Sequence, residues 1–338
     1  MTLLPPSMTA VAYRRNLAID DPESLIDVEL PVPSPGPHDL LVAVEAVSVN
    51  PVDVKVRSGV DPAGATKVLG YDAAGVVSAV GSDVSRFEVG DEVYYAGSID
   101  RAGTNSAYHL VHENIVGIKP TTLTFAEAAA MPLTAITAWE ALFERLQLTN
   151  ESSGTMLVVG AAGGVGSMMI QLARQLTSLT LIATASRPES RTWVTELGAH
   201  HVVDHRSDLV ESVRAIAPDG VDYLFSAYSK GNLEVFSEVL KPYGKIVVID
   251  DPGQVDMGAL KRKSIAWLWE FMFTAALFTP ESRSQHHILN AVTELVDAGV
   301  IRSTLSTQLS PINAEMLRRA HGLVEDGSII GKIVLSRS

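Results

Sequence analysis

A glycine-rich turn between a strand and a helix constrains this chain more than any other feature. The apolar stretch Met156–Val159 has the composition of a strand and runs into Gly160-Ala-Ala-Gly-Gly-Val-Gly166, and residues 164–176 then have helical spacing. This order is typical of dinucleotide binding, because glycines let the backbone approach the pyrophosphate and the helix N-terminus offers it free N–H groups. The residues expected to bind the cofactor here are Gly160, Gly163, Gly164, Val165 and Gly166.

The strict G-x-G-x-x-G pattern would begin at Ala161, so the turn departs from it at one position. An ordinary turn that starts a helix is the alternative interpretation. The surrounding sequence favours the cofactor, because strands and helices alternate on both sides of the turn.

The end of the next strand indicates which dinucleotide binds. Enzymes that use NAD place Asp or Glu about 20 residues after the glycines, where it binds the ribose 2′-hydroxyl. Here that place is taken by Ser186, followed by Arg187 and Arg191. A guanidinium group suits a phosphate, whereas a carboxylate would repel it. We therefore expect NADP(H), the alternative being two solvated arginines at a helix start.

Patterning along the chain predicts an α/β protein with two parts. Residues 10–120 have short β-branched runs between Pro and Gly breaks, at 40–49, 73–80, 91–95 and 107–112. Residues 125–148 are alanine-rich with helical spacing, interrupted at Pro132. Strands are then predicted at 156–159, 180–185, 201–203, 221–225 and 245–249, alternating with helices at 164–176, 189–197, 209–217 and 233–240. Such alternation is typical of a doubly wound parallel sheet.

The remaining segments complete this organisation. Helices are predicted at 285–297 and 314–325, and a strand at 331–335. The most apolar stretch, residues 265–278, is shorter than the roughly 20 residues that a membrane span needs. We expect it to be a buried or interface segment. Its aromatic residues Trp267, Trp269, Phe271 and Phe273 fit a domain joint or dimer contact better than a substrate wall.

Composition excludes several classes of function. Lys and Arg number 26 against 39 Asp and Glu, a net charge of −13, which disfavours nucleic acid and anionic membranes as partners. The chain has no cysteine, which excludes disulfides, thiolate nucleophiles and cysteine-ligated zinc. The opening residues lack the form of a signal peptide, so we expect a cytoplasmic location.

Several motifs resemble those of the medium-chain dehydrogenase/reductase superfamily, in its zinc-free quinone oxidoreductase branch. They are Ser48-Val-Asn-Pro-Val-Asp53, Leu69-Gly-Tyr-Asp-Ala-Ala-Gly75, the glycine turn, Leu197-Gly-Ala199 and Gly331-Lys-Ile-Val-Leu335. The resemblance covers nearly the whole chain and includes a subgroup labelled zinc-binding alcohol dehydrogenase-like. It implies a GroES-like β-rich catalytic domain at 1–133 and 282–338, and an NADP-binding Rossmann domain at 134–281.

The resemblance also implies which residues lie where zinc members bind their metal. Asn50 stands in place of a cysteine and Tyr71 in place of a histidine, and neither is a competent substitute. We therefore expect no metal. Without a Lewis acid to lower the pKa of an alcohol, ordinary alcohol oxidation loses its catalyst.

By the same resemblance, Asn50, Thr137 and Ser226 lie near the nicotinamide, and Ser186, Arg187, Arg191 and His205 near the adenosine phosphate. The catalytic candidates are Asn50, Lys55 and Tyr71. Lys55 is either a proton donor or a solvated lysine. Tyr71 either donates to a carbonyl or only packs in the core, and packing is favoured. Asp53 either orients its neighbours or stabilises a turn.

The chemistry left without zinc is hydride transfer from NADPH to an acceptor that delocalises negative charge. We expect a small-molecule electrophilic substrate, with a quinone or similar carbonyl favoured. The alternatives are reduction of the C=C bond of enones or alkenals, and a non-catalytic NADPH-binding sensor. A homo-oligomer, with a dimer favoured, is expected from the family.

Overall fold

The computed structural model describes residues 4–337, which form two compact units. One unit comprises the chain up to Leu133 together with the chain from Phe273 onward, and the other comprises Thr134–Met272. The domain boundaries expected from the resemblance remain a proposal.

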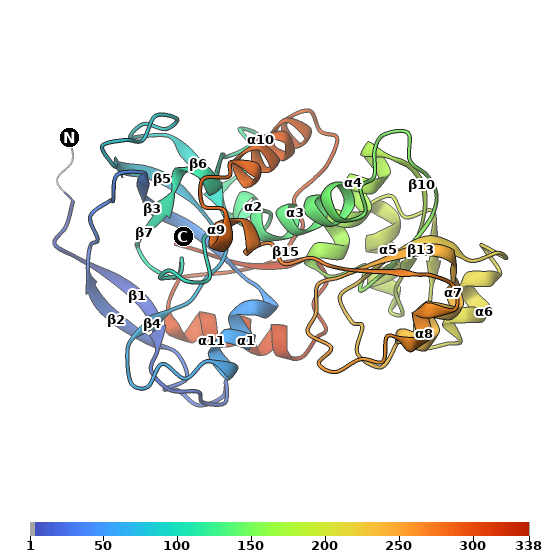
Figure 1. The fold of residues 1–338 in the computed structure, drawn as a ribbon. Helices are drawn as coiled ribbons and strands as arrows, with labels where there is room; N and C mark the ends of the chain where they lie inside the picture. Colours follow the sequence, from blue (N-terminus) through green and yellow to red (C-terminus); the bar gives the residue numbers. More distant parts are fainter. Residues whose placement is uncertain (1–3, 338) are drawn as a thin grey trace. The chain divides into compact units, whose positions relative to one another are not determined.

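The first unit contains two mainly antiparallel sheets, and its strands follow the β-branched runs of the sequence (Figure 1). One has the strand order β2-β1-β4, and the other the order β15-β16-β3-β5-β6-β8, with β7 also paired to β3. Their bounds are β1 Ser7–Tyr13, β2 Ile26–Pro31, β3 Asp39–Val49, β4 Lys67–Val68, β5 Ala73–Val80, β6 Glu92–Tyr95, β7 Tyr108–His112, β8 Val116–Ile118, β15 Leu305–Leu309 and β16 Lys332–Ser336.

The helices of the first unit pack against these sheets and against each other. Helix α10 lies on β8, α2 lies on β3 and β5, and α1 lies beside α11 (Figure 1). Their bounds are α1 Pro51–Gly59, the 3₁₀ turn η1 Glu113–Ile115, α2 Phe125–Ala129, α9 Thr274–Phe278, α10 Ser284–Asp297 and α11 Ala314–Glu325.

The second unit is built on an entirely parallel sheet with the order β11-β10-β9-β12-β13-β14. The chain turns from one half of the sheet to the other between β9 and β12, which is where sheets of this kind bind ligands, at the carboxyl ends of the strands. The strands are β9 Ser153–Val159, β10 Ser178–Thr184, β11 His201–Val203, β12 Val221–Ser226, β13 Leu240–Val248 and β14 Ala266–Trp269.

The helices of the second unit are α4 Gly164–Leu176, α5 Pro188–Glu196, α6 Leu209–Arg214, α7 Leu233–Val239 and α8 Gly258–Lys261. Helix α3 Pro132–Trp139 enters this unit and continues as a π-helical segment, η2 Glu140–Arg145.

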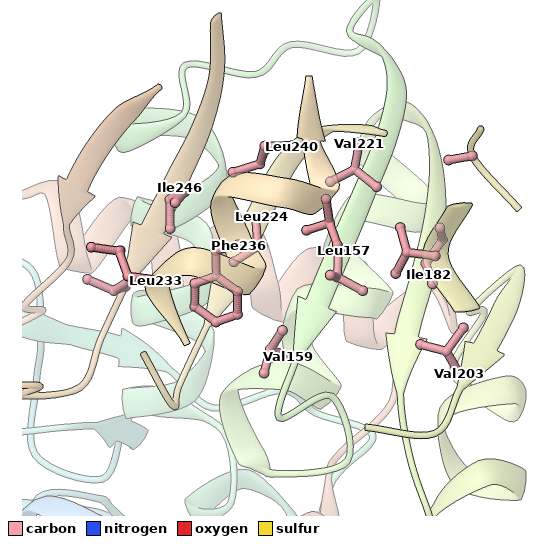
Figure 2. Packing of buried hydrophobic residues seen from close by; sticks show 14 of the residues in the cluster. Leu157, Val159, Ile182, Val203, Val221, Leu224, Leu233, Phe236, Leu240 and Ile246 are labelled. Carbon is pink, nitrogen blue, oxygen red and sulfur yellow. The ribbon is translucent and has the colours of Figure 1, made fainter. Parts of the chain in front are cut away.

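Apolar side chains fill the space between the parallel sheet and helices α6, α7 and α8. Figure 2 shows Phe236 of α7 among strand residues that include Leu157 and Leu224. Met156 and Val158 are also buried, and because side chains alternate along a strand they point to the opposite face. Burial on both faces explains why these strands are continuous apolar runs.

The predicted fold class is confirmed, and most predicted elements are present. Helix α4 and strand β11 have the predicted bounds. The segment 265–278 is not one apolar element, because it contains β14, a polar interruption at Glu270 and then α9. Of its aromatic residues, Phe273 is buried while Trp269 and Phe271 are exposed. Within the described residues, no helix is long and apolar enough to cross a membrane.

Candidate functional site

The glycine turn after β9 brings the start of α4 very close to the end of the strand. A Cβ on Gly166 would lie 2.4 Å from the carbonyl oxygen of Gly160 and 2.6 Å from Cα of Ala161, so only glycine allows this approach. Gly160 has φ of +79°, which glycine adopts most readily. The turn also has an anchor on the neighbouring strand, because the Gly160 N–H donates to Thr184 Oγ1 at 3.2 Å.

The N-terminus of α4 has free hydrogen-bond donors. Its N-cap is Gly163, which has no side chain to accept from the helix, so helix geometry leaves the N–H groups of Gly164, Val165 and Gly166 without intrahelical partners. A Cβ on Gly163 would meet, within 4 Å among the described residues, only the Gly160 carbonyl oxygen, at 3.4 Å. Open space beside free N–H groups at a positive dipole end fits a pyrophosphate.

The predicted 2′-phosphate residues follow β10. Ser186 and Arg187 lie in the turn to α5, with partly exposed side chains. Arg191, one turn into α5, donates from Nη1 to the Ala185 carbonyl at 3.1 Å and from Nη2 to the Val202 carbonyl at 3.2 Å. Arg191 therefore also connects the ends of β10 and β11. His205 lies exposed in the turn after β11.

The residues assigned to the nicotinamide have different surroundings. Ser226 is the last residue of β12, and its buried Oγ accepts from the Tyr228 N–H at 3.0 Å. Thr137 is buried on α3. Asn50 is the residue before α1 and belongs to the first unit.

A buried polar centre in the first unit surrounds the carboxylate of Asp72. Its Oδ2 accepts from Ser48 Oγ at 2.9 Å, Asn50 Nδ2 at 2.7 Å and Lys332 Nζ at 2.9 Å. Its Oδ1 accepts from the Leu133 N–H at 2.8 Å. Four donors, one of them the ammonium group of Lys332, compensate the burial of this charge.

The same centre fixes the orientation of the Asn50 carboxamide. Lys332 Nζ donates to Asn50 Oδ1, while Asn50 Nδ2 donates to Asp72, so the two ends of the amide are distinguished. An amide nitrogen carries two N–H groups, and Asp72 takes only one of them.

Asp53 is a second buried carboxyl beside this centre. It accepts from the Asn50 N–H at 2.8 Å and from the Gly70 N–H at 2.9 Å. Burial raises its pKa to about 7, the nearby Asp72 adding to the effect while these N–H groups and Lys332 oppose it. Asp53 therefore holds the start of α1 to the segment that contains Tyr71.

The other two catalytic candidates lie apart from the Asp72 carboxylate contacts. Lys55 is exposed on α1. Tyr71 is buried, with its ring edge-on to Phe273 at a centroid separation of 5.4 Å. Burial raises the pKa of Tyr71 above its ordinary range, so its hydroxyl keeps its proton. Its contacts favour packing, while a role for Lys55 remains a proposal.

Comparison with known proteins places this geometry in a family. Residues 36–140 match the alcohol dehydrogenase GroES-like domain, and residues 197–335 match the zinc-binding dehydrogenase family. A zinc-type alcohol dehydrogenase-like protein of Staphylococcus epidermidis is 35% identical over 97% of this chain and 99% of its own length. The chain belongs to the medium-chain dehydrogenase/reductase superfamily.

The names of other similar proteins indicate different activities. A 2-methylene-furan-3-one reductase of Solanum lycopersicum is 30% identical over 98% of this chain and 80% of its own length. A structure from Rhizobium etli CFN 42, assigned provisionally as a zinc-dependent alcohol dehydrogenase, is 51% identical with a TM-score of 0.94, covering 98% of each chain. The Escherichia coli quinone oxidoreductase complexed with NADPH is 26% identical with a TM-score of 0.84, over 97% of this chain and 99% of its own.

The residues of this medium-chain dehydrogenase/reductase do not fit the zinc ion that three of these names imply. Where the resemblance expects ligands, the chain has the amide of Asn50 and the phenol of Tyr71, and it contains no cysteine. Within residues 4–337, no group of three or more His, Cys, Asp or Glu side chains could hold a metal. An ammonium group, Lys332 Nζ, contacts Asn50 and Asp72 instead. The chain thus fits the zinc-free branch of the superfamily.

Sequence reasoning did not find the centre around Asp72. Lys332 was part of a matching motif, but its pairing with Asp72, 260 residues away, was not expected. The signal was present, since Lys332 is the one charged residue in the apolar strand segment 331–335 and Asp72 interrupts an apolar run. Thr184, which anchors the glycine turn, was also missed.

Proposed function

We propose that this protein catalyses metal-independent hydride transfer from NADPH to a quinone or a similar electrophilic carbonyl acceptor. The observation that carries the proposal is the uncapped N-terminus of α4 at the glycine turn, with Ser186 and Arg187 at the end of the next strand. Members of the superfamily are oxidoreductases, and one similar structure contains NADPH.

The residues would hold the cofactor in two groups. The N–H groups at residues 164–166 would bind the pyrophosphate, and Ser186, Arg187, Arg191 and His205 would bind the 2′-phosphate of the adenosine. Residues 184–188 are Thr-Ala-Ser-Arg-Pro, so the end of this strand carries no carboxylate to repel that phosphate. Bound NADPH supplies a hydride. Thr137, Ser226 and Asn50 would orient its nicotinamide.

The protein's part in the reaction is to orient the acceptor and to stabilise developing negative charge. A quinone or conjugated carbonyl delocalises that charge, so it needs no Lewis acid. The free N–H of the Asn50 amide can donate to the acceptor oxygen, and Lys332 and Asp72 hold that amide in place. Lys55 and Tyr71 are further candidates for donation to the acceptor.

Reduction of the C=C bond of an enone or alkenal is the second candidate function. The specific observation in its favour is the 30% identity to a 2-methylene-furan-3-one reductase over 98% of this chain. The same residues would serve it, because the enolate formed by hydride addition also places charge on a carbonyl oxygen. A sensor that binds NADPH without turnover is the remaining alternative.

An acceptor comparison tests the proposal. NADPH labelled with deuterium on the transferred position is incubated with the protein and either a para-benzoquinone or a methyl vinyl ketone-type enone. Faster NADPH oxidation with the quinone supports the favoured function. Deuterium at the β-carbon of a saturated ketone, at a higher kcat/KM, would replace it with the enone activity. Binding of NADPH without oxidation by either acceptor would favour the sensor.

The cellular location and the oligomeric state of the enzyme are also part of the proposal. A cytoplasmic location and a homodimer are predictions from sequence and family, and size-exclusion chromatography with light scattering would test the second.

A further inference from the structure

Tyr228 is a large aromatic residue left exposed where the parallel sheet is expected to bind its ligand. Its side chain follows the end of β12 and 62% of the residue's surface is accessible. Exposed aromatic surface is unfavourable in water, and binding of a ligand that covers it recovers that free energy.

The ring of Tyr228 lies against the glycine turn. A Cβ built on Gly160 would be 3.0 Å from Tyr228 Cε2 and 3.2 Å from Cδ2, so the edge of the ring faces the first residue of the turn. Gly160 follows β9 and Tyr228 follows β12, and these strands are neighbours in the sheet. This is the point where the order of the strands reverses, outside which ligands of such sheets bind.

Hydrogen bonds hold the backbone around Tyr228 in place while its side chain stays exposed. The Tyr228 N–H donates to Ser226 Oγ and its carbonyl accepts from Asn232 Nδ2, both at 3.0 Å. Ser229 donates from its N–H and its Oγ to the carboxylate of Asp250, both at 2.7 Å. The exposed ring of Tyr228 therefore extends from a turn whose backbone is held by hydrogen bonds.

We propose that the ring of Tyr228 packs against the bound nicotinamide dinucleotide beside the pyrophosphate, as an aromatic wall of the cofactor site. The proposal rests on the proposed cofactor. The residues assigned to the 2′-phosphate follow β10 and β11, on the far side of β9 from β12. Tyr228 therefore contacts a part of the dinucleotide that NADPH and NADH share.

The experiment measures dissociation constants for NADPH and NADH by titration calorimetry with wild-type protein, Tyr228→Ala, Tyr228→Phe and a control variant. The control is Tyr243→Ala. Tyr243 is 79% exposed, but it lies in β13 beside the start of β12, and so at the opposite end of the strands from Tyr228. Thermal unfolding by circular dichroism checks that each variant is folded. Kinetic constants with a quinone are measured in parallel.

We expect Tyr228→Ala to weaken the binding of NADPH and of NADH by the same factor, about five- to twentyfold, because the aromatic contact is lost. Tyr228→Phe keeps the ring and stays within about twofold of wild type, as does Tyr243→Ala. The KM for NADPH rises while kcat is retained, because the contact is made in the ground state and the transition state alike.

Four results would overturn the proposal. Unchanged affinity in Tyr228→Ala would show that the ring makes no contact, leaving the proposed function intact. A loss confined to NADPH would place Tyr228 at the 2′-phosphate, and a loss in Tyr228→Phe equal to that in Tyr228→Ala would assign the contact to the hydroxyl. Failure of wild-type protein to bind either dinucleotide would remove the proposed function itself and this inference with it.

Discussion

Lys332 Nζ lies 2.9 Å from Asp72 Oδ2, and both side chains are buried in the first unit. The pair joins the start of β16 to the segment before β5, and each partner also contacts Asn50. In a centre without metal ligands, this ion pair fixes the amide that the proposed mechanism uses. The removal of one partner leaves the other charge buried and unpaired.

Lys332→Met therefore should destabilise the protein strongly. We expect the free energy of unfolding in urea to fall by about 3–5 kcal/mol. The matched control is Lys241→Met, because Lys241 forms an ion pair with Asp222 at the same distance of 2.9 Å but about a third of each side chain is exposed. That variant should lose less than about 1 kcal/mol. An equal fall in the free energy of unfolding in the two variants would contradict the claim that the buried ion pair contributes more to stability than the exposed one.

Two buried glutamates make stability depend on pH. Burial raises the pKa of Glu140, and its hydrogen bond to Glu270 and their mutual repulsion add to this; burial also raises the pKa of Glu270. The folded state keeps protons that the unfolded chain releases above about pH 4.5, the ordinary glutamate value. The contribution to stability is therefore fully present below that pH and is lost as the pH rises through the raised values.

Glu140→Gln removes the need to retain a proton while keeping the shape of the side chain. We expect its free energy of unfolding to fall less steeply than that of wild type between pH 5 and pH 9, with a gain of about 1–3 kcal/mol at the upper end. Urea unfolding at a series of pH values measures this. Glu234→Gln, at an exposed position on α7, should keep the wild-type slope. A slope in Glu140→Gln identical to that of wild type would refute the explanation by a raised pKa of Glu140.

His321 and His109 are both buried but differ in their hydrogen bonds. Neither ring nitrogen of His321 has a partner within residues 4–337, whereas His109 is 2.9 Å from the Ala102 carbonyl and 3.1 Å from Tyr95 Oη. Burial, with Arg57 nearby, lowers the pKa of His321 to about 3, so the ring is neutral near pH 7. We expect His321→Leu to raise the free energy of unfolding by about 1–2 kcal/mol and His109→Leu to lower it by about 1–3 kcal/mol. Loss of stability in His321→Leu comparable to that in His109→Leu would show that His321 is satisfied in solution.

Arg187→Ala tests the choice of cofactor. Loss of a guanidinium–phosphate interaction should weaken NADPH binding by about 10- to 100-fold. The affinity for NADH should stay within about twofold of wild type, because only NADPH carries the 2′-phosphate. Dissociation constants from fluorescence titration measure both. Arg191→Ala would in addition remove the hydrogen bonds from Arg191 to the Ala185 and Val202 carbonyls, so its effect on both cofactors is measured beside that of Arg187→Ala. Equal losses for the two cofactors in Arg187→Ala would exclude Arg187 from the 2′-phosphate site.

Features that depend on neighbours along the chain were predictable from the sequence. Helix α4 has the predicted bounds because the glycine turn and the apolar period both lie within one short segment. Helix α1 was missed, because Asn50-Pro-Val-Asp53 reads as a turn, although Pro at the first helical position and the Asp53 bond to the Asn50 N–H begin a helix. Strand β14 was missed since a short apolar run has no period that separates strand from helix.

Contacts between distant segments were not predictable in the same way. Lys332 reaches Asn50 and Asp72 because β16 pairs with β3 in the register Ile333 to Val49. That register is set by the whole sheet, and a one-residue shift would turn Lys332 to the other face. Glu140 lies in the π-helical segment η2 and Glu270 directly follows β14, so the two are distant in sequence and nothing local marks them as a pair.

Metal-independent reduction by NADPH is most directly tested on protein dialysed against EDTA, with its zinc content measured by mass spectrometry. NADPH oxidation is followed with a small para-quinone, before and after zinc is added back. We predict that protein with less than about one zinc per hundred chains oxidises NADPH at the undialysed rate and gains no activity from added zinc. Activity that disappears with the metal and returns with zinc would contradict it.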